Sequence, residues 1–119
     1  MSVQKINSQE RPLAPMYSHA VKIPGLVFCS GQIPADSTGN VVPGDIKVQC
    51  LSNLSDVLKT AGSSWDKVVK VNIYLKNMGD FAAMNEEYIK AHPKPARTCI
   101  QAGGLPLDVD IEIEAIAAV

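Results

Sequence analysis

The stretch "DVDIEIEAIAAV" (Asp108–Val119) decides the fold class. Two sets of residues alternate along it: Ile111, Ile113, Ala115 and Ala117 in one set, and Asp110, Glu112, Glu114 and Ile116 in the other. Successive side chains of a β-strand point to opposite faces of the sheet. The stretch therefore predicts a strand with one apolar face toward a core and a second face that is partly polar.

Four further segments also have strand character. They are "SHAVKI" (18–23) and "LVFCS" (26–30), joined by a hairpin signal at Pro24-Gly25, then "KVVKVNIYL" (67–75) and "RTCIQA" (97–102). In the third, alternation predicts one wholly apolar face: Val69, Val71, Ile73 and Leu75. In the fourth, it places Arg97, Cys99 and Gln101 on one side of the strand.

Two segments between these strands have the periodicity of amphipathic helices. The first runs from Gly44 to Ala61, and Gly62 follows at the position of a C-terminal cap. The second runs from about Asp80 to Ala91, with Phe81, Met84 and Tyr88 on one face, and Pro93 and Pro95 end it.

The order of strands, helix, strand, helix and two strands predicts an α+β fold, a two-layer sandwich with both helices on one face of the sheet. The other face is expected to carry Val68, Tyr74, Cys99 and Ile116 beside polar groups. Such a face is too apolar for water and too polar for a sealed core. We therefore expect subunits to associate through it, with polar pockets at the seams.

Length, net charge and cysteine spacing limit the functions that the chain is expected to have. The 119 residues fit a single domain (1–119), 46% of them are hydrophobic, and the net charge of −1 gives no reason to expect nucleic acid as a partner. The cysteines, Cys29, Cys50 and Cys99, have no metal-binding spacing and predict free thiols. The N-terminus lacks the pattern of a signal or transit peptide, so we predict a cytoplasmic protein, with a mitochondrial one as the alternative.

Arg97 is the first candidate for a functional residue. It is either a solvated or ion-paired arginine at the start of a strand, or a clamp whose planar fork binds a carboxylate through two hydrogen bonds. Glu112 and Glu114 either mark the wet face of a strand or orient and deprotonate a water molecule. The spacing of these residues does not decide between the readings.

Three more candidates have an equally plain alternative. Cys99 is a buried thiol or a nucleophile, and no basic partner for it is evident. The segment from Ser30 to Gln32 is a turn, or it exposes backbone N–H groups to a ligand, because Gly31 permits close approach. Tyr17 either stacks on a planar ligand or packs against the protein.

Several motifs together resemble one family. They are "YSHA" (17–20), "FCSGQIP" (28–34), "VVKVNIYL" (68–75), "FAAMNEEY" (81–88), "KPARTCI" (94–100) and "LPLDVDIEIEAIA" (105–117). In this order and with this spacing they are similar to the reactive intermediate deaminase (RidA, or YjgF-like) family, and the similarity covers nearly the whole chain.

The resemblance implies a chorismate-mutase-like fold with a mixed sheet, a homotrimer with active sites between subunits, and no metal or organic cofactor. It implies hydrolysis of 2-enamine and 2-imine acids, such as 2-aminoacrylate, to 2-oxo acids and ammonia. Arg97 is implied to bind the substrate carboxylate and Glu112 to handle water or a proton. The residues implied to line the pocket are Tyr17, Ser30, Gly31, Asn85 and Cys99.

Two other functions stay open. Some family members are described as ribonucleases or translation inhibitors, which the net charge of −1 and the few aromatic residues argue against here. The other is a ligand-binding or holdase-type trimer without the chemistry, which the presence of both Arg97 and Glu112 argues against.

Overall fold

The computed structural model describes residues 2–42, 46–91 and 94–119. Its elements, in chain order, are β1 (Gln4–Ile6), β2 (Ala20–Ile23), β3 (Leu26–Gln32), α1 (Ile46–Thr60), η1 (Trp65–Lys67), β4 (Val68–Leu75), η2 (Met78–Asp80), α2 (Phe81–Ala91), β5 (Ala96–Gln101), η3 (Pro106–Asp108) and β6 (Ile111–Ala118). The strands and helices predicted from the sequence are present. The short strand β1 was not predicted.

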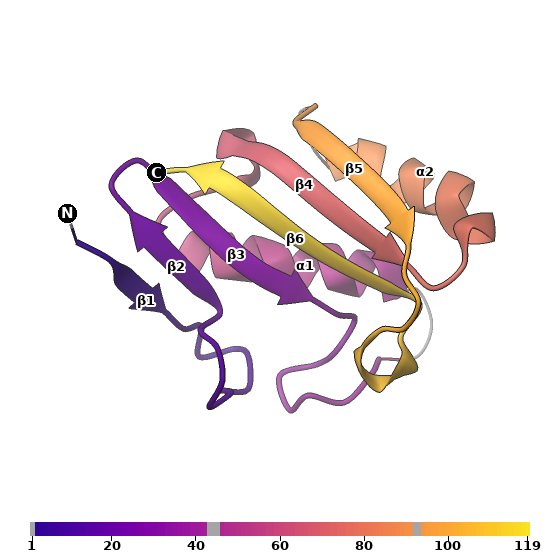
Figure 1. Ribbon diagram of the computed structural model, residues 1–119, viewed down its shortest axis with the longest axis horizontal. Coiled ribbons are helices and arrows are strands. Elements are labelled where there is room, and N and C mark those ends of the chain that lie inside the picture. The colour runs from indigo at the N-terminus through magenta and orange to yellow at the C-terminus, as the bar shows by residue number, and fades with distance from the viewer. Residues whose placement is uncertain (1, 43–45, 92–93) are drawn as a thin grey trace.

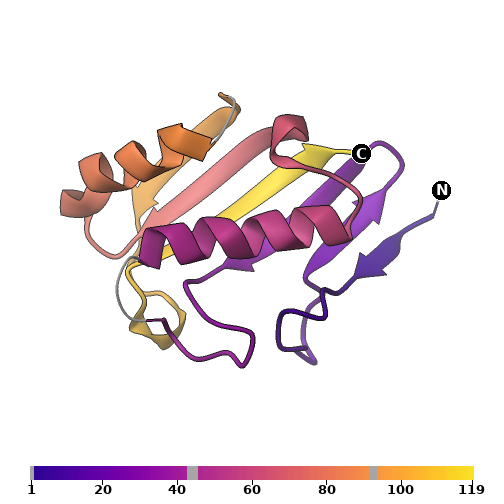
Figure 2. The same cartoon turned by 180° about the vertical axis from the view of Figure 1, so that it is seen from behind.

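The strands form one mixed sheet in the order β1-β2-β3-β6-β4-β5 (Figure 1). Strands β4 and β5 are parallel, and the other neighbours are antiparallel. Both helices lie on the same face of the sheet (Figure 2). The predicted two-layer α+β arrangement with a mixed sheet is therefore confirmed.

Helix α1 builds the core with the inner faces of β3, β4 and β6. The buried residues include Cys50, Leu54, Val57, Leu58, Val71, Ile73, Ile113 and Ala115. The helix ends where expected, because Gly62 has a φ of 82° and the N–H of Ser63 donates to the carbonyl oxygen of Leu58 at 2.8 Å. Gly44, the first residue of the first predicted helix, and Pro93, predicted to end the second, lie outside the described residues.

A β-bulge corrects the predicted inner face of β4. Val68 pairs with Ala117 and Lys70 with Ile116, so Val69 is an extra residue in the ladder. The bulge reverses the alternation before Val71. Val68 is consequently buried, whereas Val69, predicted to lie on the apolar face, is 49% exposed.

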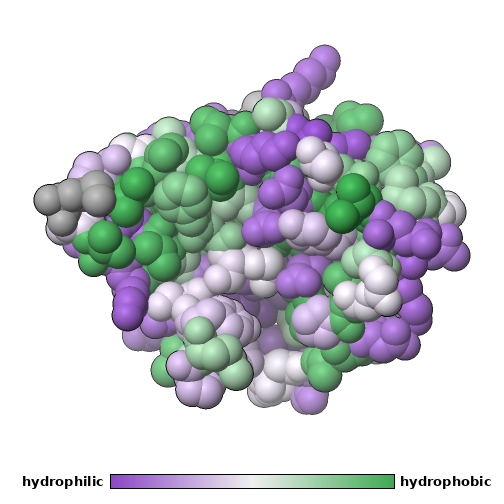
Figure 3. Space-filling view, in the orientation of Figure 1, coloured by the Kyte–Doolittle hydropathy of each residue, from purple (hydrophilic) through white to green (hydrophobic). Residues whose placement is uncertain are grey.

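The sheet face opposite the helices is uncovered in the single chain (Figure 1). Tyr74 and Ile116 lie on it, as predicted, and Phe28 and Ile100 are among its exposed apolar residues. Figure 3 shows green hydrophobic areas beside purple hydrophilic ones across this side of the molecule. The prediction was wrong for Val68 and Cys99. Val68 is reversed by the bulge, and Cys99 pairs with the inward-facing Ile73.

Candidate functional site

Arg97 lies on the helix-covered face of β5, beneath α2. This follows from the β4–α2–β5 crossover, because the helix that connects two parallel strands packs back onto them. Nη1 of Arg97 donates a hydrogen bond to Oδ1 of Asn85 at 2.7 Å. Its Cζ lies 5.0 Å from the ring centroid of Tyr88 and 5.7 Å from that of Phe81. We call Arg97, Asn85, Phe81 and Tyr88 the arginine cluster.

Helical spacing explains the arginine cluster, since residues 81, 85 and 88 of α2 share one face. The helical pattern of the sequence groups Phe81 with Tyr88, but it does not reveal that both rings contact Arg97. The order of the elements could have indicated this contact, because the helix before a parallel strand packs on that strand and its inward-facing side chains lie against those of the strand. The two rings and the amide of Asn85 hold the guanidinium in one orientation.

Arg97 has no carboxylate partner among the residues that the structure describes. The ion pairs found there join Lys76 to Asp108 and Lys90 to Glu87, and neither involves Arg97. The reading of Arg97 as one half of a structural ion pair therefore has no support in the described chain. A half-buried guanidinium with one neutral acceptor retains donors for an anion.

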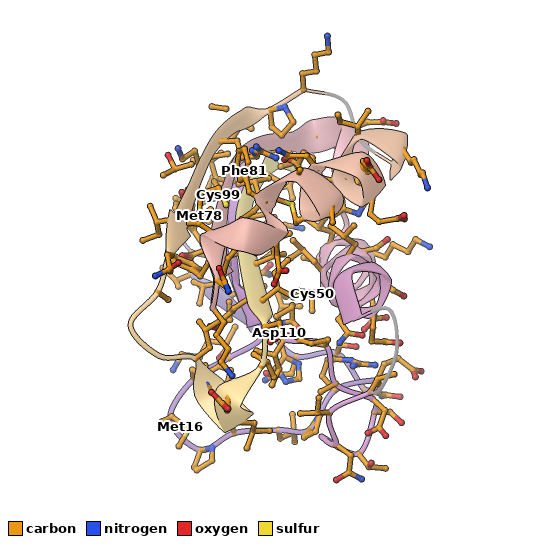
Figure 4. All side chains as sticks on the ribbon, turned by 90° about the vertical axis from the view of Figure 1, so that its right-hand side faces the viewer. Met16, Cys50, Met78, Phe81, Cys99 and Asp110 are labelled. Carbon is orange, nitrogen blue, oxygen red and sulfur yellow. The ribbon has the colours of Figure 1, made fainter. Side chains whose placement is uncertain are left out.

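Cys99 lies two residues after Arg97, on the same face, and is half-buried against the core. Figure 4 labels it at the end of the molecule where β5 and α2 lie. Burial raises the pKa of its thiol, and the nearby Arg97 charge only partly opposes this. The thiol is therefore predominantly protonated at neutral pH, which argues against a nucleophilic role.

Glu112 lies on the opposite, uncovered face, beside Gly31. A Cβ atom at position 31 would lie only 2.4 Å from Oε1 of Glu112 and would overlap it. Glycine is therefore the only residue at position 31 that allows the Glu112 carboxylate to lie where it does. Burial and the neighbouring Glu114 carboxylate raise the pKa of Glu112. The result is a partly desolvated carboxyl group that takes up a proton more readily than an exposed glutamate.

Glu114 is held by Tyr74, a contact that sequence reasoning missed. The hydroxyl of Tyr74 donates a short hydrogen bond to Oε1 of Glu114, and this bond is the main cause that raises the pKa of Tyr74 to about 12. In the strand register Tyr74 pairs with Glu112. Tyr74 thus stands beside one glutamate and anchors the other. We call Glu112, Gly31, Glu114 and Tyr74 the glutamate cluster.

Ser30 and Gly31 lie in a bulged part of β3 instead of the predicted turn after a shorter strand, because the pairing with β6 shifts between Cys29 and Gln32. The Ser30 hydroxyl donates to the carbonyl oxygen of Ser18 at 2.7 Å, so it holds β3 to the preceding segment. Tyr17 is 53% exposed and lines a pocket of about 210 Å³ together with Gly31.

The two clusters do not meet within one chain. Strand β4 lies between β5 and β6, so these two strands are about 10 Å apart. Along β5, Ile100 is level with Glu112, because both pair with Tyr74, and Arg97 is three residues, or about 10 Å, from Ile100. Their Cα atoms are thus about 14 Å apart. The two side chains also lie on opposite faces of the sheet, so one small molecule cannot contact both from the same chain.

The described residues contain no group of three or more His, Cys, Asp or Glu side chains that could hold a metal ion. Neither helix in that part of the chain is long and apolar enough to cross a membrane.

Comparison with known proteins gives consistent matches. The sequence model of the family described as endoribonuclease L-PSP matches residues 8–119. Protein mmf2, mitochondrial, of Schizosaccharomyces pombe is 50% identical, with 99% of each chain covered. The crystal structure of YyfA of Yersinia pestis, titled a member of the conserved Rid protein family, is 33% identical and superposes with a TM-score of 0.93 over 99% of this chain and all of that one.

A third match is the crystal structure of E. coli TdcF with bound serine, 33% identical, with a TM-score of 0.87 and 98% of each chain covered. The sequence match to mmf2 and the superpositions on the two crystal structures each cover nearly the full length of this chain. The resemblance first noted in the sequence motifs is therefore confirmed, and the chain belongs to the RidA/YjgF family, whose sequence model is described as endoribonuclease L-PSP.

Proposed function

We propose that this protein hydrolyses 2-imino and 2-enamino acids to 2-oxo acids and ammonia, at sites between the subunits of a homotrimer. The observation that carries the proposal is the arginine cluster. Arg97 is half-buried, oriented by Asn85 and two aromatic rings, and without a carboxylate partner in the described chain. Such a guanidinium is suited to a small ligand carboxylate.

Binding would begin with this carboxylate. The amide of Asn85 occupies only Nη1, which leaves other N–H groups of the Arg97 fork for the two oxygens of the ligand. The rings of Phe81 and Tyr88 displace water from around the charge, which strengthens its attraction for an anion. The serine bound to TdcF carries the same carboxylate group, which supports a substrate of the amino-acid class.

Glu112 would supply the proton chemistry. A 2-enamine takes a proton at its terminal carbon and becomes the imine. Water then adds to the carbon of the protonated imine while Glu112 accepts a proton from it. Glu112 returns this proton to the nitrogen of the carbinolamine, the C–N bond breaks to release ammonia, and the hydroxyl group loses its proton as it becomes the carbonyl of the 2-oxo acid. The raised pKa of Glu112 makes its carboxyl group a readier proton carrier than that of an exposed glutamate. Because such imines hydrolyse readily in water, positioning and one proton carrier are sufficient.

A site between two subunits would allow the arginine cluster and the glutamate cluster to act on the same substrate. Arg97 and Glu112 of one chain lie on opposite faces of its sheet, so they act on one substrate only if a second subunit brings its arginine cluster to the first subunit's glutamate cluster. The uncovered face, with Phe28 and Ile100 exposed, provides an apolar surface for such an assembly.

The test is a direct assay on a 2-imino acid generated in the cuvette by an amino-acid oxidase, with ammonia and 2-oxo acid release followed over the spontaneous rate. The family description favours a second candidate, an endoribonuclease, so RNA cleavage is measured on the same preparation. Accelerated imine hydrolysis without RNA cleavage supports the proposal. RNA cleavage alone would favour the ribonuclease. Binding of small carboxylates without either activity would favour a non-catalytic trimer.

The cellular location has a separate test. The relative mmf2, which shares half of its aligned residues with this chain, is named mitochondrial, and this supports the mitochondrial alternative. A fluorescent fusion at the C-terminus, imaged with a mitochondrial stain, separates that location from the cytoplasm.

A further inference from the structure

A polar pocket extends from Gly31 away from the arginine cluster. It has a volume of about 210 Å³. Its walls are the segment before β2, which includes Arg11 and Tyr17, the end of β3, the loop after it, which includes Asp36, and Asn53 of α1. A single water molecule needs roughly 10–15 Å³ by the same measure. The methyl group of the simplest 2-imino acid would leave most of this space to water.

Arg11 is the cation of this pocket. Its Nη1 donates to the carbonyl oxygen of Ala35 at 3.0 Å, and its buried Nε has no hydrogen-bond partner in the described chain. The carboxylate of Asp36 lines the same pocket but forms no ion pair with Arg11. Its Oδ1 instead accepts hydrogen bonds from Thr38 and from the N–H of Asn40. The guanidinium, with five N–H donors, is therefore short of acceptors.

Other polar groups in the pocket wall are already engaged. Nδ1 of His19 accepts from the N–H of Ser8, and its Nε2 donates to the carbonyl oxygen of Pro12. The amide of Asn53 donates to the carbonyl oxygens of Ile33 and Ala35. These groups shape the pocket but are not available to a ligand, which leaves Arg11 as its charged donor.

We propose that this pocket is a second anion subsite and that Arg11 selects 2-imino acids whose side chain ends in a carboxylate. The inference rests on the proposed function. The imine carbon carries the α-carboxylate and the side chain on different bonds. If the α-carboxylate binds Arg97 of one subunit, the side chain is free to enter the pocket beside Gly31 of the other and reach Arg11. Asp36 opposes this weakly, because its carboxylate already accepts hydrogen bonds from Thr38 and Asn40 of its own loop.

Ligand binding tests the subsite without requiring turnover. Succinate and its monoamide have nearly the same shape and differ by one negative charge, so titration calorimetry with both isolates the charge. We expect the protein to bind succinate about tenfold more tightly, the effect of one charge-assisted hydrogen bond. Arg11→Gln should abolish this preference. Lys59→Gln, which removes an exposed positive charge from the end of α1, is the matched control and should keep it.

Kinetics supply the second arm, with the imines of aspartate and asparagine as the matched pair. We expect kcat/KM to favour the aspartate imine about tenfold in the natural protein and in Lys59→Gln, but not in Arg11→Gln. If Arg11→Gln does not fold, Arg11→Lys is measured instead. It keeps the charge and loses the fork, so the preference should fall but stay above one.

The results of these two experiments can overturn the proposed anion subsite and the proposed deaminase activity independently of each other. Equal affinity for the two succinate ligands, or a preference that Arg11→Gln or Arg11→Lys leaves unchanged, would overturn the subsite. Turnover of the alanine imine with no preference for the aspartate imine would overturn it while keeping the deaminase. An Arg11-dependent preference in calorimetry with no turnover of any imine would keep the subsite and overturn the proposed function.

Discussion

At the scale of single residues, Arg97→Lys tests whether the guanidinium is a two-pronged clamp. Lysine keeps the positive charge but loses the planar fork and at least one charge-assisted hydrogen bond, worth about 1.5–3 kcal/mol. We expect kcat/KM for a 2-imino acid to fall about tenfold to a hundredfold, with the fold and the oligomeric state unchanged. Steady-state kinetics near those of the natural protein would mean that Arg97 only supplies charge.

Glu112 and Glu114 are predicted to have different roles, the first in proton transfer and the second in the hydrogen bond with Tyr74. Glu112→Gln removes the proton carrier and should reduce kcat strongly, while calorimetric binding of a carboxylate ligand is retained because Arg97 is intact. Glu114→Gln keeps an oxygen that can accept the Tyr74 hydrogen bond and should leave most of kcat. Equal losses of kcat in the two variants would show that the wrong carboxylate has been assigned.

The pH profile gives a sharper measure of this pair. Burial and the charge of Glu114 raise the pKa of Glu112, and the group that accepts a proton from water must be ionised. Activity should therefore fall as the pH drops through that pKa. In Glu114→Gln the like charge is gone, so the acid limb of kcat/KM should move to lower pH. Glu87→Gln, the same change on α2, is the control and should leave the limb in place.

Gly31→Ala tests the close approach of the glutamate cluster. The added methyl group would overlap Oε1 of Glu112, which lies at the end of a flexible side chain and can move away. We expect a large loss of kcat/KM with little change in the midpoint of urea unfolding. A folded, fully active Gly31→Ala protein would show that the position of the Glu112 carboxylate does not matter for the reaction.

At the scale of elements, α1 is predicted to carry much of the stability. Leu54 is fully buried between this helix and the sheet, and Leu54→Ala should lower the free energy of unfolding by about 2–5 kcal/mol. Ile89→Ala, a similar truncation at a residue of α2 that is 73% exposed, should change it by less than about 0.5 kcal/mol. Denaturant titration of both variants makes the comparison, and similar losses would argue against the described packing of α1.

At the scale of the whole molecule, we expect a homotrimer that depends on the uncovered sheet face. Phe28→Asp places a charge on that face without disturbing the core, since Phe28 is 42% exposed in the single chain. Light scattering should report three subunits for the natural protein and smaller species for the variant. Imine hydrolysis should be lost together with assembly, because neither cluster is complete alone. A natural protein that is monomeric at micromolar concentration would remove the proposed site.

The sequence by itself determined the two long helices, the strands other than β1, the layer architecture and the family. Alternation fixed the faces of β6, helical spacing fixed the buried face of α1, and Gly62 marked the end of that helix. These features are local, because each follows from backbone geometry over a few residues. Seven candidate site residues were also named from the sequence, although their roles stay predictions.

Only the tertiary structure decided which of these residues lie together. Alternation could not place Val69, because one extra residue in the pairing with β6 reverses the faces of a strand. Nor could it tell which face of β5 the helices cover, so Cys99 was assigned to the wrong side of the sheet. The separation of Arg97 from Glu112 and the hydrogen bond from Tyr74 to Glu114 depend on strand order and on the packing of α2, which join positions far apart in the chain.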